Sequence, residues 1–153
     1  MYKKIGLISL ICLFVDQLTK FIVISKMSLF SSIEVIKSFF SITYVRNYGA
    51  AWSILEGSNI FLILFALSSL FLIYWLFIKN HNKLSKLDII TYGMLIGGII
   101  GNLIDRIIYG YVIDFLDFNI FKYDYPVFNM ADVFIVVAVG LIIFSILRGK
   151  DAA

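Results

Sequence analysis

Four apolar runs, each about as long as a lipid bilayer is thick, dominate this chain. They cover Ile5–Ile24, Asn59–Ile78, Leu87–Ile108 and Ala131–Leu147. A membrane-spanning helix needs about 20 consecutive apolar residues. Of the 153 residues, 61% are hydrophobic and 15% charged, whereas soluble domains contain about 25% charged residues. The sequence therefore predicts one small integral-membrane domain, 1–153, built on four transmembrane helices.

Basic residues predict how these helices are oriented, because short cytoplasmic loops carry an excess of Lys and Arg. Such residues gather at the N-terminus, in the hairpin after the second run and in the tail: Lys3, Lys4, Lys79, Lys83, Lys86, Arg148 and Lys150. Both termini are therefore expected in the cytoplasm. The two longer connections, 25–58 and 109–130, are expected on the outer side.

The first outer connection is expected to be ordered. Segment Phe39–Trp52 places β-forming residues on either side of an Asn-Tyr-Gly turn signal, which predicts a small extracytoplasmic β-structure. In Ser28–Lys37 four apolar residues recur at helical spacing: Leu29, Phe30, Ile33 and Ile36. That spacing predicts a short amphipathic helix at the membrane surface. In the second outer connection, Asp117 and Asp124 are expected to be solvated loop charges.

Two aspartates interrupt the apolar pattern at the outer ends of the last two runs. Asp132 opens the fourth run, and Asp114 follows a few residues after the third. Carboxylates near lipid are costly and mark a candidate functional site. Two carboxyl groups held close together share one proton, which is what an aspartic hydrolase requires. A helix cap is the structural alternative for Asp132.

Other polar residues lie within the first and third runs. Asp16 and Lys20 are one helical turn apart, in the favourable order for pairing, and fit a scaffold or lipid-headgroup role. Asn102, Asp105 and Arg106 form a polar patch near the outer end of the third run, on the side that also carries several glycines. This patch fits a structural network or a direct chemical role. The neighbouring guanidinium suits Asp105 to positioning rather than proton transfer.

Several function classes are disfavoured. The only histidine, His81, lies in the predicted cytoplasmic hairpin, and the only cysteine, Cys12, lies inside the first run. The sequence therefore has neither a His-Glu-x-x-His zinc motif nor an outer serine–histidine pair, and no metal or other cofactor is expected. Nucleic acid is not an expected partner, because the basic residues follow membrane topology.

Two alternatives to an aspartic hydrolase remain. The acids could line a proton or cation path, although the inner halves of all four runs are almost purely apolar. The chain could also be a non-catalytic assembly or lipid-binding subunit, with the acids tying its loops together. Replacing Asp114 or Asp132 by Asn separates these alternatives from an enzyme, which would lose cleavage while keeping its fold.

Five short segments occur in this order along the chain: Asp16–Lys20, Asn47–Ser53, Gly97–Arg106, Val112–Phe115 and Phe128–Asp132. Together they resemble the motifs of the bacterial lipoprotein signal peptidase family, signal peptidase II. The resemblance covers nearly the whole chain. It implies a four-helix membrane aspartic endopeptidase with a small extracytoplasmic β-cradle.

The resemblance also implies roles. Asp114 and Asp132 match the catalytic pair of the family. Other positions match residues that line or support its site: Asn47, Gly49, Asn102, Asp105, Arg106, Asn129, Asp16 and Lys20. The three asparagines are suited to clamp substrate backbone, and the segment that ends at Trp52 is expected to roof the cleft.

The implied substrate is a diacylglyceryl-modified prolipoprotein, cut just before its lipidated cysteine. The implied location is the bacterial cytoplasmic (inner) membrane, in contact with its lipids, with the active site near the outer face. Globomycin-type peptide antibiotics are expected inhibitors.

Overall fold

Four long helices make up most of the structure, a computed structural model that describes the chain except for residues 50–53, 80–83, 121–122 and 151–153. They are α1 (Tyr2–Lys26), α2 (Asn59–Ile73) continued by the π-helical turn η2 (Tyr74–Ile78), α3 (Lys86–Tyr109) and α4 (Met130–Lys150). Each of the four is long and apolar enough to cross a membrane. The four predicted spans are confirmed to within a few residues.

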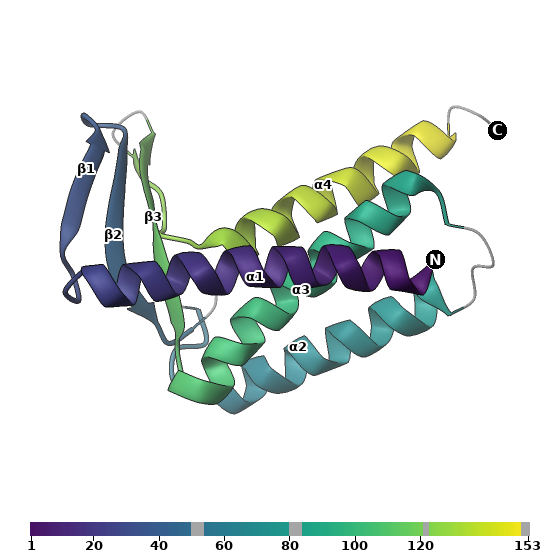
Figure 1. Cartoon of the computed structure of the whole chain (residues 1–153), viewed down its shortest axis with the longest axis horizontal. Helices are drawn as coiled ribbons and strands as arrows, with labels where there is room; N and C mark the ends of the chain where they lie inside the picture. Colours follow the sequence, from purple (N-terminus) through teal and green to yellow (C-terminus); the bar gives the residue numbers. More distant parts are fainter. Residues whose placement is uncertain (50–53, 80–83, 121–122, 151–153) are drawn as a thin grey trace.

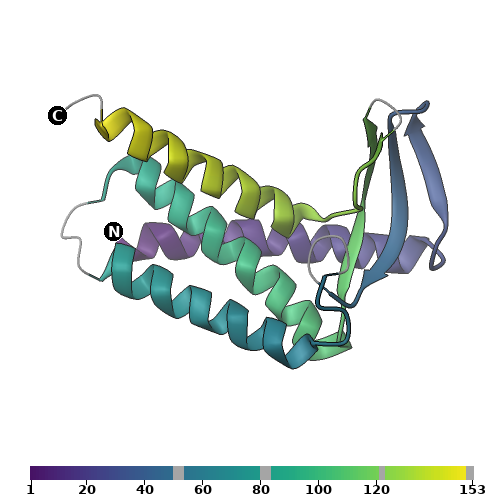
Figure 2. The ribbon, with the colours of Figure 1, turned by 180° about the vertical axis from the view of Figure 1, so that it is seen from behind.

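Helix α3 is the element on which the other three helices pack. Figures 1 and 2 show α2 and α4 on opposite sides of α3. Glycines on α3 permit this close packing: a Cβ on Gly97 would lie 2.7 Å from the Ser9 carbonyl oxygen of α1. A Cβ on Gly98 would lie 2.6 Å from the Ala131 carbonyl oxygen of α4. The predicted approach of neighbouring helices to the glycine face is therefore confirmed.

The ends of α3 are set by local signals. Ser85 and Asp88 form a capping box at its start, in which each side chain accepts a hydrogen bond from the other residue's backbone N–H. At the other end Gly110 adopts a left-handed conformation with φ of 79°, which ends the helix. The chain turns there directly into the strand that carries Asp114.

An antiparallel sheet lies across one end of the helices, opposite both termini (Figure 1). Its three main strands are β1 (Ser32–Ile36), β2 (Phe40–Asn47) and β3 (Val112–Ile120), and the two-residue β4 (Tyr123–Asp124) extends it in the order β1-β2-β3-β4. The register of β2 and β3 pairs Val45 with Asp114 and Asn47 with Val112. This pairing joins the connections 25–58 and 109–130 and places Asn47 close to the catalytic candidate Asp114.

The predicted helix in Ser28–Lys37 is wrong, because this segment contains strand β1. Phe30 and Ser38 have φ of 66° and 57°, conformations that interrupt a helix on either side of the strand. Between them the β-branched residues of the sequence Ser-Ile-Glu-Val-Ile favour extended backbone. Pairing of Ser32 with Thr43 and of Glu34 with Ser41 supplies hydrogen bonds that an isolated surface helix would lack.

The predicted β-structure in Phe39–Trp52 is confirmed for β2. The strand ends at the Asn-Tyr-Gly signal, and its neighbours are β1 and β3. Residues 50–53, which include Trp52, lie outside the described residues. Asp117 is also not a loop charge, since it lies in β3 and accepts a hydrogen bond from Thr43 Oγ1 over 2.6 Å. Asp124 lies in β4.

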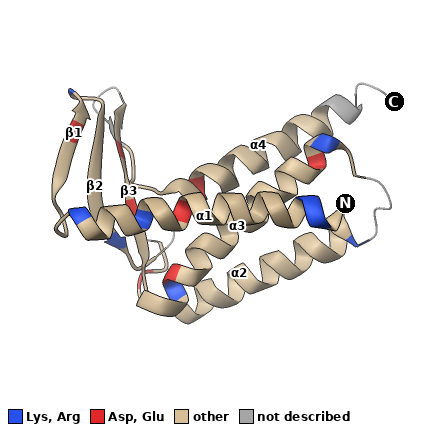
Figure 3. Cartoon of the chain, in the orientation of Figure 1, with Lys and Arg blue, Asp and Glu red and all other residues tan. Residues whose placement is uncertain are grey.

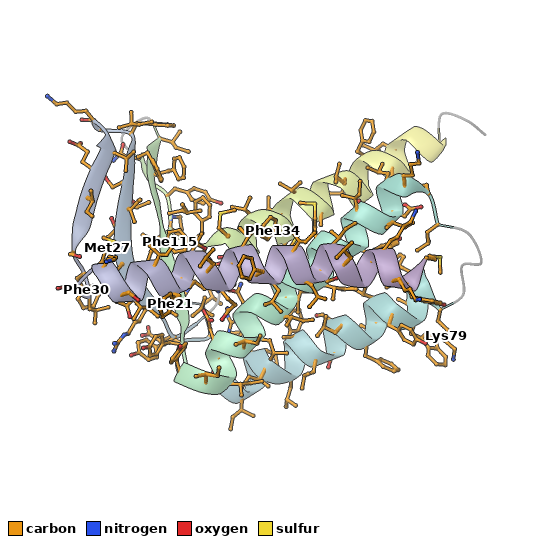
Figure 4. The ribbon with its side chains drawn as sticks, in the orientation of Figure 1. Phe21, Met27, Phe30, Lys79, Phe115 and Phe134 are labelled. Atoms are coloured by element: carbon orange, nitrogen blue, oxygen red, sulfur yellow. The ribbon has the colours of Figure 1, made fainter. Side chains whose placement is uncertain are left out.

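The outer surfaces of the helices are apolar, as lipid contact requires. The side chain of Phe21 on α1 is 66% exposed, and many other large apolar side chains are similarly exposed. Figure 4 places Lys79 at the end of the molecule opposite the sheet, where its ammonium lies 3.8 Å from the centre of the Trp75 ring. Figure 3 shows further basic residues, in blue, near the same end, and others near the sheet. This arrangement fits a multi-pass membrane protein.

Candidate active site

Asp114 and Asp132 reach one site from different elements. Asp114 lies on β3, with 2% of its surface exposed, and Asp132 lies in the first turn of α4. Both side chains line the same cavity. Asn129 contacts both: its Nδ2 donates to Asp114 Oδ1 over 2.6 Å, and its backbone N–H donates to Asp132 Oδ2 over 3.2 Å. The structure thus places the two acids, predicted from the sequence, around one bridging residue.

Asn129 and Asp132 also begin helix α4. The Asn129 Oδ1 accepts from the Asp132 backbone N–H over 3.1 Å, which completes a reciprocal capping arrangement with the bond from Asn129 N–H to Asp132 Oδ2. The helix-cap alternative for Asp132 is therefore correct for one carboxylate oxygen. The other oxygen, Oδ1, accepts a hydrogen bond from Asn102 Nδ2 over 2.8 Å. Asp132 serves as a cap and lines the cavity at the same time.

Asn102 connects the site to a buried ion cluster. Its Oδ1 accepts from Lys20 Nζ and from Asn129 Nδ2, each over 3.0 Å. With its oxygen held by these two donors, its Nδ2 group is directed to Asp132. The orientation of this amide is consequently fixed by its surroundings.

The ion cluster comprises Lys20 and two carboxylates. Lys20 Nζ lies 2.9 Å from Asp16 Oδ2 and 2.9 Å from Asp105 Oδ2, and all three side chains are almost completely buried. Gln17 Nε2 donates to both carboxylates, over 3.2 Å to Asp16 and 3.0 Å to Asp105. None of the four lines the cavity. The scaffold role predicted for Asp16 and Lys20 is therefore supported, whereas burial of Lys20 excludes contact with lipid headgroups.

Arg106 and Asn47 also line the cavity. The Arg106 guanidinium donates to the Gly49 carbonyl oxygen over 3.1 Å, which ties the end of β2 to α3. Asn47 Nδ2 donates to Asp114 Oδ2 over 2.9 Å, and Asn47 Oδ1 accepts from the Gly49 backbone N–H over 2.9 Å. Gly49 thus contacts both Arg106 and Asn47 through its backbone. The polar patch predicted on α3 divides, with Asn102 and Arg106 in the cavity and Asp105 behind it.

The cavity has a volume of about 1360 Å³ and a polar end beside the sheet. The polar residues of this end are Asn47, Asn102, Arg106, Asp114 and Asp132. From there an apolar groove extends along α3, with residues of α2 on one side and residues of α4 on the other. Along α2 its lining continues from Phe61 to Ile73, which corresponds to about 20 Å of helix. The site is therefore the end of a long apolar groove rather than an isolated pocket.

Burial and charge both act on Asp114. Burial of the carboxyl group raises its pKa from the ordinary value to about 7, with a further contribution from the charge of Asp132. Hydrogen bonds from Asn47 and Asn129 act in the opposite direction and limit the rise. Near neutral pH, Asp114 can therefore hold a proton beside its partner carboxylate.

Some residues of the candidate site were not predicted from the sequence, and two predicted positions lie outside the described residues. Gln17 was not a predicted site residue, although its position next to Asp16 on a buried helix face was the available signal. The segment 125–128 also lines the cavity, and its proline was the only sequence signal of a fixed turn. The proposed roof, Trp52, and the predicted hairpin residue, His81, are not among the described residues.

Comparison with known proteins gives consistent matches. A family model described as signal peptidase (SPase) II matches residues 8–148. The lipoprotein signal peptidase of Staphylococcus aureus (strain JH9) is 43% identical over 97% of this chain and 93% of that protein. A bacterial membrane enzyme solved by the in meso method at 2.3 Å resolution matches with a TM-score of 0.89 and 38% identity, covering 98% of this chain and 90% of the other. A second such structure, at 1.9 Å resolution, has a TM-score of 0.85 and 38% identity, covering 97% and 94%.

Proposed function

Because the chain belongs to the lipoprotein signal peptidase family, aspartic peptidase family A8, we propose that Asp114 and Asp132 are its catalytic pair. The protein is a multi-pass bacterial membrane enzyme that removes signal peptides from prolipoproteins. One observation carries the assignment: both carboxyl groups line the polar end of a single apolar groove, and Asn129 contacts both. The chain acts as a single peptidase domain, 1–153.

The raised pKa of Asp114, caused mainly by burial, suits this residue to be the proton donor. Asp132 is then the general base of the pair. The Asp132 carboxylate removes a proton from a water molecule, whose oxygen attacks the carbonyl carbon of the scissile bond, while Asp114 donates its proton to the carbonyl oxygen. When the tetrahedral intermediate breaks down, its carbon–nitrogen bond cleaves and a proton passes from Asp132 to the leaving amine. Asp114 takes back a proton from the hydroxyl group that it had protonated, which restores the carbonyl.

The three asparagines act on the carboxyl groups. Asn47 and Asn129 donate to Asp114, and Asn102 donates to Asp132. These amides hold the two acids in place before substrate arrives, and such preorganisation avoids rearrangement during the reaction. We therefore assign these amides to positioning the carboxyl groups. Clamping of the substrate backbone by the same asparagines stays a prediction.

The groove accounts for the choice of substrate. A signal peptide contains an apolar segment, and the groove between α2 and α4 offers it an apolar surface that ends at the two aspartates. The diacylglyceryl chains of the modified cysteine stay in lipid against the helices, so the bond just before this cysteine reaches the acids. Both termini lie in the cytoplasm and the site lies near the outer face. Globomycin-type peptide antibiotics inhibit by occupying the polar end of the groove.

The test uses purified protein in detergent with a diacylglyceryl-modified prolipoprotein. We expect Asp114→Asn and Asp132→Asn each to lower kcat by at least about 10³-fold, because general acid–base help contributes about 10²–10⁴-fold, while the melting temperature stays near that of the wild type. Asp117→Asn is the matched control: it lies on the same strand but outside the cavity and should cleave normally. Substantial cleavage by either catalytic-pair variant would refute the assignment.

The non-peptidase alternatives make a different prediction for the same variants. A translocating or assembly protein would show no prolipoprotein cleavage in the wild type, and its Asn variants would not change that assay. Membership of a peptidase family excludes these alternatives as the main activity.

A further inference from the structure

Each catalytic candidate is preceded in sequence by a residue whose backbone N–H donates to a buried carboxylate. Ile113, directly before Asp114, donates to Asp105 Oδ2 over 3.2 Å. Ala131, directly before Asp132, donates to Asp16 Oδ1 over 2.8 Å. The two accepting carboxylates lie on different helices, α3 and α1, and Lys20 contacts each of them at 2.9 Å.

We propose that Asp16, Lys20 and Asp105 form a bracket that sets the separation of the two catalytic aspartates, with Lys20 as the positioning residue at its centre. A continuous chain of contacts runs from the backbone before Asp114 through Asp105, Lys20 and Asp16 to the backbone before Asp132. This proposal rests on the assignment of Asp114 and Asp132 as the catalytic pair.

A second contact extends the bracket to the reacting groups. The third contact of the Lys20 ammonium is with Asn102 Oδ1, over 3.0 Å. Because the Lys20 ammonium can only donate, the Asn102 oxygen must face Lys20. The Nδ2 group of Asn102 then faces Asp132. Lys20 therefore fixes both the backbone positions of the aspartates and the direction of one hydrogen bond to them.

The cost of burying these charges favours a positioning role over simple stabilisation. Asp16, Lys20 and Asp105 are 0%, 1% and 0% exposed, within helices that cross the membrane. Buried ion pairs are often no more stabilising than apolar residues of similar volume, and one attested benefit is that they specify a unique geometry. An aspartic peptidase needs such a geometry, since a displacement of about 1 Å can cost about 100-fold in rate.

The bracket predicts a specific kinetic change in Lys20→Met. We expect kcat to fall by about 100-fold, while KM changes less than about twofold, because Lys20 does not line the cavity. The melting temperature will also fall, since two buried carboxylates lose their partner. Asp88→Ala is the matched control: it removes the cap at the far end of α3, lowers the melting temperature and leaves kcat of the folded enzyme unchanged.

A triple variant separates positioning from charge neutralisation. Lys20→Met with Asp16→Asn and Asp105→Asn removes all three charges but keeps side-chain oxygens that can accept from Ile113 and Ala131. We expect its melting temperature to return toward that of the wild type while kcat stays about 100-fold low. Recovery of kcat together with the melting temperature would overturn the proposal, as would a Lys20→Met variant that loses substrate affinity instead of turnover.

Failure of the bracket is distinguishable from failure of the catalytic assignment. If Asp114→Asn and Asp132→Asn are inactive but the triple variant is fully active, the pair stands and the bracket is wrong. If the two single variants keep their activity, the catalytic assignment itself is wrong.

Discussion

The side-chain amide of Asn129 donates a hydrogen bond of 2.6 Å to Asp114, a residue on a different element of the fold. The same side chain accepts from the backbone N–H of Asp132, so one asparagine sets the start of α4 and contacts both acids. The start of α4 and the geometry of the site therefore depend on the same residue, Asn129.

Substitution of Asn129 can separate the two roles of this residue. Asn129→Ala should lower stability by about 1 kcal/mol through loss of the helix cap and lower kcat by more than tenfold. Asn129→Ser keeps a capping oxygen but has no amide to donate to Asp114, so it should recover the melting temperature without recovering kcat. Thermal unfolding and steady-state kinetics check both. A Ser variant with wild-type turnover would show that the bond to Asp114 is not needed.

The raised pKa of Asp114 predicts a fall in activity above neutral pH. The reaction requires a protonated Asp114, so kcat/KM should decline by about tenfold for each pH unit above about 7. Burial is the main cause of the shift and the charge of Asp132 the second. In Asp132→Asn, infrared titration of the Asp114 carboxyl band should therefore give a lower pKa than in the wild type. An unchanged midpoint would contradict close electrostatic contact between the two acids.

The same shift predicts how stability depends on pH. Because the folded-state pKa of Asp114 is raised, its contribution to stability is complete below the ordinary value of 3.8 and is lost as the pH rises through about 7. The melting temperature of the wild type should therefore fall across this window relative to that of Asp114→Asn, which cannot titrate there. Parallel melting curves for the two proteins would contradict the raised pKa.

Gly98 predicts a link between helix packing and catalysis. A Cβ at this position would lie 2.6 Å from the Ala131 carbonyl oxygen, next to Asp132. Gly98→Ala should therefore destabilise the fold by about 1–3 kcal/mol and also lower kcat by displacing the first turn of α4. Gly140→Ala on α4 is the control, because a Cβ there meets nothing within 4 Å. Equal effects of the two substitutions on kcat would refute this link.

The apolar groove can be tested by filling it. Ala66 on α2 lines the groove, so Ala66→Trp should narrow it and raise KM by more than tenfold with little effect on the melting temperature. Leu67→Trp is the neighbouring control, because Leu67 is exposed on the outer surface of α2 and does not line the groove. KM values from a detergent assay with a full-length prolipoprotein report the difference. If Ala66→Trp leaves KM unchanged, the signal peptide does not lie in this groove.

The sequence alone determined the four helices and the residue types of the site. In lipid, backbone polar groups must be satisfied within the segment, so an apolar run of about 20 residues has essentially one solution. Local signals also specified the ends of α3 through Ser85, Asp88 and Gly110. Asp114 and Asp132 could be selected because carboxylates next to membrane-spanning helices are costly.

Only the tertiary structure decided how the outer segments pair and which polar residues meet. The segment containing Ile33 and Ile36 has a periodicity that fits a helix, but hydrogen bonds from β2 make it a strand. The contact of Asp16 with the Ala131 backbone joins residues 115 positions apart. Local periodicity carries no information about such a partner, because the partner is brought there by the packing of α1 and α4 around the glycine face of α3.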